Sequence, residues 1–326
     1  MKTTYLKQLK TIDNEYLLER LNICDFEHYI QADEFQYVFD HIFNIFNAES
    51  QKYNIRKPIF VYTESDSLNA CAIKSNDFNI VSFNKGLILI SINEILDNDK
   101  LQEFNNSFKS TSEFLNIKIE RLIFQFTMLF TFYHEFGHLL QNTNEELNMS
   151  EANQENTNDV KNSHYKELDA DAYSAVHLAR HINEYCVKSF PPDILKECII
   201  GITAIFCSNL LFHLLRFPSS KRDLYFEENT HPHAYIRILN IIANIVRYIN
   251  SDANLLERNV HITKKDLLKP IVDEVYRLES IYDSSLHNFK DCVINEIENI
   301  TKYITKISKN KPSDLNSALD FYNSKI

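Results

Sequence analysis

The chain has 326 residues, of which 44% are hydrophobic and 24% charged, as is ordinary for a globular protein with a substantial buried core. Its formal net charge is −11 and no dense basic stripe interrupts the acidic background, which argues against nucleic acid as a partner because phosphates would be repelled. Only three glycines and seven prolines occur, which favours a mainly helical protein because sheets and tight hairpins usually need more turn-forming residues.

The first 55 residues are expected to form N-terminal helices, since apolar side chains recur at helical spacing. A section rich in β-branched and aromatic residues follows. Four short segments in it are predicted as strands or strand-to-helix transitions: residues 58–62, 69–73, 80–83 and 87–90. The sequence thus predicts a small β-sheet after the first helices.

Helical patterns return after the predicted sheet and continue to the end of the chain. They begin with a helix over residues 115–141, dense in Leu, Ile and Phe. Residues 141–163 almost lack large apolar side chains and are predicted as an exposed loop. Further helices are expected at about 164–185 and 194–216, and charged amphipathic helices after a turn at residues 230–232.

One apolar stretch, residues 198–215, approaches the length of a membrane span. Polar residues such as Asn209 and His213 interrupt it, and Glu197 and Arg216 bracket it. We interpret it as a buried core helix rather than a membrane segment. A membrane-embedded protein that uses this stretch as a span is the alternative.

The six cysteines are scattered and include no CxxC pair, which fits reduced, packed thiols better than a disulfide framework. The first twenty residues carry charge throughout and lack the apolar run of a signal peptide. These two features predict a cytoplasmic protein.

Residues 134–138 read HEFGH and form an HExxH motif near the end of an apolar helix. His134 and His138 lie one turn apart and about 40° apart around a helix, so both imidazoles can reach one metal ion. Glu135 lies about 100° round from His134 and can contact a water on the metal. Zinc acidifies such a water, and a carboxylate can take its proton during attack on a peptide carbonyl.

A catalytic zinc site needs three protein ligands, and the next predicted helix offers the third. A metzincin would have glycine at position 141 and histidine at position 144, but this chain has Gln141 and Asn144. Residues 167–171 instead read ELDAD, in which Glu167 and Asp171 share one helix face. Glu167 can complete the site, and Asp171 can accept a hydrogen bond from the far nitrogen of a ligand histidine. This is the gluzincin arrangement, with one Zn²⁺ per chain.

Four separated segments carry a family resemblance: residues 69–72 (NACA) with the later pair Gly86-Leu87, then HEFGH, ELDAD and the element His231-Pro232 with Arg237. In this order they resemble gluzincin peptidases of the Ste24/HtpX-like type, over about residues 58–245. Soluble bacterial relatives, including phage-exclusion peptidases of the Lit type, are similar to a comparable degree. The membrane helices of many Ste24/HtpX-like members are not evident in this chain.

The resemblance implies further roles for the matched residues. His231 would stabilise the oxyanion near the zinc, and Arg237 would brace the Glu167 region. The strand formed by Asn69, Ala70, Cys71 and Ala72 would be the sheet edge on which an extended substrate lies, paired through its backbone.

We therefore expect an α+β, mainly helical fold, with a zincin-like catalytic domain and a small β-sheet beside the HExxH helix. A single domain is expected over residues 1–326. It would consist of N-terminal helices (1–55), a gluzincin catalytic core (56–250) and a C-terminal helical extension (251–326).

The predicted function is a zinc-dependent endopeptidase that acts on a protein or peptide substrate. The alternative is a catalytically silent zinc-binding regulatory or scaffold protein, although a purely structural site has no use for Glu135 and prefers four protein ligands. No metal-binding role is predicted for four other histidines. His177 and His181 are expected to line a helix face, and His164 and His233 are expected to be surface residues.

Overall fold

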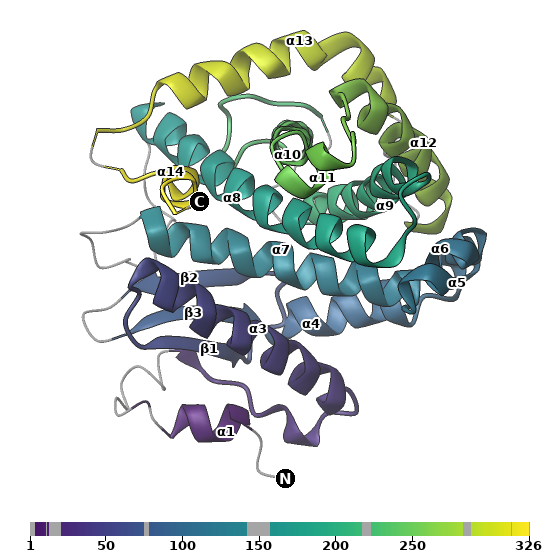
Figure 1. Cartoon of the computed structure of the whole chain (residues 1–326). Helices are drawn as coiled ribbons and strands as arrows, with labels where there is room; N and C mark the ends of the chain where they lie inside the picture. Colours follow the sequence, from purple (N-terminus) through teal and green to yellow (C-terminus); the bar gives the residue numbers. More distant parts are fainter. Residues whose placement is uncertain are drawn as a thin grey trace.

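The computed structural model of the protein describes residues 4–10, 12, 21–74, 78–141, 157–216, 223–282, 288–313 and 315–325. Over these residues the protein is mainly helical with one small sheet (Figure 1). This confirms the predicted α+β, mainly helical class. Most of the predicted loop, residues 142–156, lies outside the described residues.

The N-terminal region consists of helix α1 (Thr4–Leu9), the short turn η1 (Phe26–His28) and the longer helix α3 (Ala32–Tyr53). Asn54 caps the C-terminal end of helix α3, and its left-handed conformation lets its backbone N–H bond to carbonyls of the last turn. Its apolar stripe is buried and packs on the first strand of the sheet. The stripe consists of Phe35, Val38, Phe39, Ile42 and Phe46.

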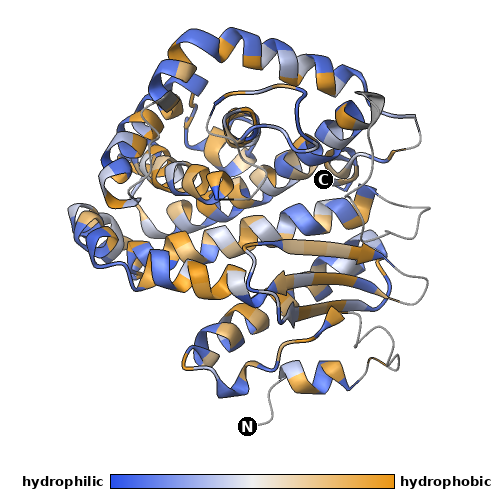
Figure 2. Ribbon diagram, turned by 180° about the vertical axis from the view of Figure 1, so that it is seen from behind, coloured by the Kyte–Doolittle hydropathy of each residue, from blue (hydrophilic) through white to orange (hydrophobic). Residues whose placement is uncertain are grey.

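The sheet has three strands, β1 (Pro58–Thr63), β2 (Ala70–Lys74) and β3 (Asn79–Asn84), in the order β1-β3-β2. The central strand β3 is parallel to β1 and antiparallel to β2. Side chains alternate between the main core on one face and a smaller apolar cluster on the other. Both faces are therefore covered, and all three strands are coloured as hydrophobic in Figure 2.

Short helical segments connect the sheet to the central helices. They are α4 (Lys85–Ser91), η2 (Ile92–Leu96), α5 (Asp99–Asn105), η3 (Asn106–Phe108) and α6 (Lys109–Leu115). The run at 87–90 was expected to be a strand or a strand-to-helix transition, and it is helical. Leu87 and Ile88 are fully buried, and a short apolar run of this kind fits a buried helix and a strand equally well.

Two long helices, α7 (Ile119–Gln141) and α8 (Thr157–Ser189), lie side by side through the middle of the protein (Figure 1). Helix α7 is buried along almost its whole length and lies against the outer strand β2. Helix α8 begins seven residues before the predicted start at about residue 164. The HExxH motif is thus placed between the sheet and α8.

Helix α9 (Leu195–Leu215) is the apolar stretch seen in the sequence. Among the described residues it is the one helix long and apolar enough to cross a membrane, and 78% of its most apolar window is buried inside the protein. Burial of this extent is typical of a core helix, and α9 packs against α8.

The remaining helices are α10 (Ala234–Ile249), α11 (Ala253–Glu257), α12 (Lys264–Tyr282), α13 (Asn288–Lys309) and α14 (Ala318–Asn323). Helix α10 packs along α8, and α12 packs along α9. Helix α13 lies outermost, whereas the last helix, α14, returns to the side of α7 and α8 (Figure 1). The end of the chain therefore reaches the two helices that carry the metal motif.

The glycine of HEFGH permits a close approach of three helices. A β-carbon on Gly137 would lie 3.2 Å from Ala170 Cα, 3.3 Å from Ala170 Cβ and 3.7 Å from Ala318 Cβ. Gly201, in the middle of α9, would meet nothing within 4 Å. A methyl group would therefore be crowded at Gly137 and accommodated without contact at Gly201.

We expect Gly137→Ala to lower the free energy of unfolding by about 1–3 kcal/mol, because the methyl group would force α7 and α8 apart. Gly201→Ala is the matched control and is expected to raise it by about 0.5–1 kcal/mol through helix propensity alone. Urea unfolding of both variants measures the difference. An increase in stability for both variants would show that the helices do not depend on the close approach.

Candidate metal centre

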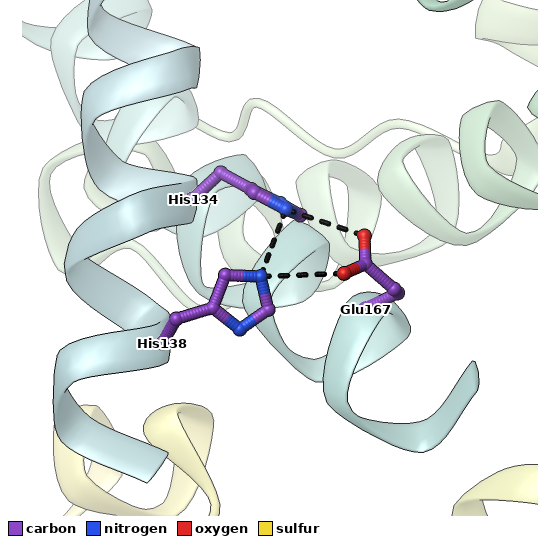
Figure 3. A group of neighbouring side chains, drawn as sticks. All are labelled: His134, His138 and Glu167. Carbon is purple, nitrogen blue, oxygen red and sulfur yellow. Dashed lines mark hydrogen bonds and ion pairs between the residues drawn. The ribbon is translucent and has the colours of Figure 1, made fainter. Parts of the chain in front are cut away.

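Three side chains from α7 and α8 point toward one another in the interior (Figure 3). His134 and His138 follow each other by one turn on α7, and Glu167 faces them from α8. His134 and Glu167 are 8% and 6% exposed. Because a polar group buried this deeply needs a partner, the three form one interacting cluster.

The spacing of the ligand atoms fits a tetrahedral metal ion. His134 Nε2 lies 3.1 Å from His138 Nε2 and 3.3 Å from Glu167 Oε2, and His138 Nε2 lies 3.4 Å from Glu167 Oε1. Ligands about 2.0–2.1 Å from a zinc ion at tetrahedral angles are about 3.3 Å apart. Two imidazoles and one carboxylate are also a donor set that zinc accepts, with a position left for water or substrate. The buried group can therefore hold a metal ion.

A second layer of charged side chains supports the cluster. Asp171 Oδ1 lies 3.0 Å from His134 Nδ1, on the side of the ring away from Nε2. Arg237 of α10 donates two hydrogen bonds to Asp171, from Nε at 2.9 Å and from Nη2 at 2.7 Å. The same Nη2 lies 3.7 Å from Glu167 Oε2. Arg237 thus stands between the two carboxylates, next to the Glu167 region.

The charges of the cluster shift the pKa values of its members. Burial alone would raise the pKa of Glu167, but the nearby His231 and His134 outweigh burial and hold it well below its usual range. Burial likewise opposes ionisation of Asp171, and Arg237 keeps the pKa of Asp171 low. For His134, burial lowers the pKa, but Glu167 and Asp171 outweigh it and raise the pKa to about 10. Both carboxylates are therefore ionised at neutral pH and available as ligand and support.

The two residues expected to act on substrate lie beside this cluster. Glu135 is the next residue after His134 on α7 and is 9% exposed. His231 lies in the segment before α10, with Nε2 3.6 Å from Glu167 Oε1 and Nδ1 3.2 Å from Thr230 Oγ1. Its side chain is about one third exposed, so it stands at the solvent side of the cluster.

The segment expected to bind substrate forms the outer strand of the sheet. Ala70, Cys71 and Ala72 belong to β2, and Asn69 directly precedes it. The order β1-β3-β2 leaves β2 at one edge, next to the helix that carries HEFGH. The structure thus brings the NACA segment and the helix that carries HEFGH together.

Part of the chain is similar to a known family. Residues 99–256 match the family model Peptidase U49. The matched segment is just under half of the chain and includes α7, α8 and α10, with all three members of the buried cluster. Peptidase U49 is a metallopeptidase family, so the match supports a metal-dependent peptidase. No curated protein and no solved structure matches the chain.

Two histidines expected at the surface are fully buried, so that prediction is wrong. His164 lies between Tyr303 Oη at 2.7 Å and the carbonyl of Asn229 at 2.8 Å, and it ties α8 to α13 and to the segment that carries His231. His233 caps α10, with Nδ1 accepting a hydrogen bond from the Tyr235 N–H. The partners of His164 lie far along the chain, and His233 caps a helix. The polarity of the neighbouring residues in the sequence indicates neither arrangement.

One residue of the site was missed from the sequence. Gln141, three positions after His138 on α7, is buried and places Oε1 2.9 Å from His138 Nδ1. The spacing of three on a helix is the only local signal of this contact.

His177 lies on α8 behind the cluster and is completely buried between aromatic rings, with the Tyr133 ring 4.2 Å away. Among the described residues, neither ring nitrogen has a hydrogen-bond partner. Burial, with help from Arg180, holds the pKa of His177 well below its usual value. The folded protein therefore keeps His177 neutral in mild acid, whereas the unfolded chain takes up a proton below pH of about 6.5.

Because only the unfolded state binds that proton, the wild type loses stability as the pH falls from 7 to 5. We expect His177→Phe to remove this loss, so that the variant gains about 2 kcal/mol relative to the wild type between pH 7 and pH 5. Urea unfolding at both pH values measures the difference, with the exposed His261→Phe as control. A constant difference between His177→Phe and wild type would show that His177 takes up its proton at the same pH in the folded protein as in the unfolded chain.

Proposed function

We propose that the protein is a zinc-dependent endopeptidase of the gluzincin type, with His134, His138 and Glu167 as the zinc ligands. The observation that carries the proposal is the buried cluster of two imidazole nitrogens and one carboxylate at tetrahedral spacing. The match to Peptidase U49 over the same helices supports a peptidase. The resemblance of four segments to Ste24/HtpX-like peptidases leads to the same class of chemistry.

Each polar side chain in and around the buried cluster has a role in the proposed hydrolysis. His134, His138 and Glu167 would hold a zinc ion, which would supply Lewis-acid chemistry for the activation of water and of the scissile carbonyl. Glu135 accepts the proton of the attacking water and returns it to the leaving amine. His231 donates a hydrogen bond to the scissile carbonyl oxygen as negative charge develops on it. Asp171 and Arg237 hold His134 and Glu167 in place.

The proposed substrate is a polypeptide in extended conformation. Strand β2 is an outer strand and runs beside the HExxH helix, so a peptide added to it passes close to the cluster. Backbone pairing requires no particular side chains, which suits an enzyme that acts on unfolded segments of proteins.

The test of this function is cleavage of an unfolded protein, such as reduced and alkylated casein, by the purified chain. We expect cleavage that a chelator abolishes and one equivalent of Zn²⁺ restores. A chain that binds one zinc and cleaves no unfolded protein under any of these conditions would support the catalytically silent zinc protein instead. A protein that requires detergent to leave the membrane fraction would support the membrane-embedded alternative.

A further inference from the structure

The second metal ligand is held by a glutamine whose orientation is fixed. The Gln141 amide nitrogen donates to the carbonyl of Lys166 at 2.8 Å and to Asp169 Oδ2 at 2.9 Å. Both partners are acceptors, so the –NH₂ group must face them and Oε1 must face His138 Nδ1. His138 therefore carries its proton on Nδ1 and keeps the Nε2 lone pair toward the cluster.

The carboxylate that fixes this glutamine is itself held by the C-terminal segment. Asp169 Oδ1 accepts from Ser317 Oγ at 2.6 Å and from the Leu319 N–H at 3.4 Å. Its other oxygen, Oδ2, accepts from the Ala318 N–H at 2.6 Å. Asp169 lies between Glu167 and Asp171 on α8, and its side chain is 8% exposed. Four donors thus satisfy one buried carboxylate.

These contacts join parts of the chain that are far apart in the sequence. Ser317 lies 148 residues from Asp169 and outside the segment that matches Peptidase U49. The close packing of Gly137, Ala170 and Ala318 brings α14 against α7 and α8 at the same level. The hydrogen bonds run without interruption from α14 to Asp169, then to Gln141 and to His138.

We propose that the C-terminal segment at α14 positions the metal ligand His138 through Asp169 and Gln141. The inference rests on the proposed zinc site. Without α14, Asp169 would lose three of its donors and would be free to leave Gln141. Without Gln141, the His138 ring would lose the contact that selects its tautomer and its orientation. Gln141, Asp169 and Ser317 are therefore positioning residues, with no contact to the substrate required.

The experiment uses the full-length protein stripped of metal and titrated with Zn²⁺ against a chromophoric chelator. Gln141→Leu removes the acceptor for His138, and Ser317→Ala removes one donor to Asp169. Ser324→Ala is the matched control, because Ser324 is exposed and its hydroxyl donates to the nearby Phe321 carbonyl. The same proteins are loaded with Co²⁺, whose visible absorption reports the geometry of the ligands.

We expect Gln141→Leu to weaken zinc binding by about 10–100-fold and Ser317→Ala by about 3–10-fold, with Ser324→Ala unchanged. The Co²⁺ spectrum should change in the first two variants while their far-UV circular dichroism stays that of the wild type. Ser317→Ala decides the matter if Gln141→Leu does not fold. If the folded variants bind zinc with wild-type affinity and give the wild-type Co²⁺ spectrum, the role of α14 in positioning His138 would be overturned, whereas the zinc site itself would be retained. A wild type that binds neither metal would instead overturn the proposed function.

Discussion

Replacing Glu135 with glutamine is expected to lower the rate of peptide hydrolysis by about 10²–10⁴-fold while one zinc per chain stays bound. The amide keeps the size of the side chain but cannot accept a proton from water. Glu135 is not part of the buried ligand cluster, so its charge is not needed to hold the metal. Cleavage of an unfolded protein and elemental analysis of the same preparation measure both quantities.

The control for this variant is Glu184→Gln, since Glu184 is an exposed carboxylate on the same helix as Glu167. It should leave both activity and zinc content unchanged. Full activity in Glu135→Gln would mean that another group takes the proton, and the mechanism would have to be reassigned.

Arg237→Leu is expected to lower the free energy of unfolding of the zinc-free protein by about 3–5 kcal/mol. Arg237 is buried and donates two hydrogen bonds to Asp171, which has no exposed surface. Its removal takes both arginine hydrogen bonds from a fully buried carboxylate, which then has only His134 beside it, and weakens the support of Glu167. Urea unfolding measures this loss, and zinc titration should show weaker binding in the same variant.

Arg247→Leu is the matched control, because Arg247 is exposed on the same helix α10. Its effect on the free energy of unfolding should remain within about 0.5 kcal/mol. Equal stability losses for the two arginine variants would show that the buried pair with Asp171 contributes nothing beyond a surface charge.

The parts of the site that could be predicted from the sequence are those that depend on the spacing of residues along one helix. The four-residue spacings of His134 with His138 and of Glu167 with Asp171 place each pair on one face of its helix. Because a catalytic zinc site needs three protein ligands, the two helices are then expected to pack together. The helical class likewise follows from scarce turn residues and long apolar periodicities, both of which are local properties of the sequence.

The parts that could not be predicted are contacts between distant segments. Asp169 stands in the same ELDAD segment as Glu167, yet its partners are Gln141 and the turn at Ser317, from both sides of the sequence. Nothing in the polarity of Ser317 distinguishes it from a surface serine. His164 was assigned to the surface for the same reason, since its partner Tyr303 lies 139 residues away. Buried polar groups are satisfied by tertiary packing, which sequence periodicity does not encode.

The run at residues 87–90 shows a second limit. Three strands precede it, and β-branched and aliphatic residues continue through it. Leu87 and Ile88 are buried and the next two side chains are partly buried, so a helix is acceptable there without a polar face.

The proposed zinc site is tested most directly by the zinc content of the purified protein, measured for the wild type beside Glu167→Ala and the exposed control Glu184→Ala. It requires no knowledge of the natural substrate. We expect one zinc per chain in the wild type and in the control, and a large loss in Glu167→Ala, because only two histidine ligands would remain. No zinc in a wild type purified without chelator would contradict a zinc site formed by His134, His138 and Glu167, and so would a full complement of zinc in Glu167→Ala.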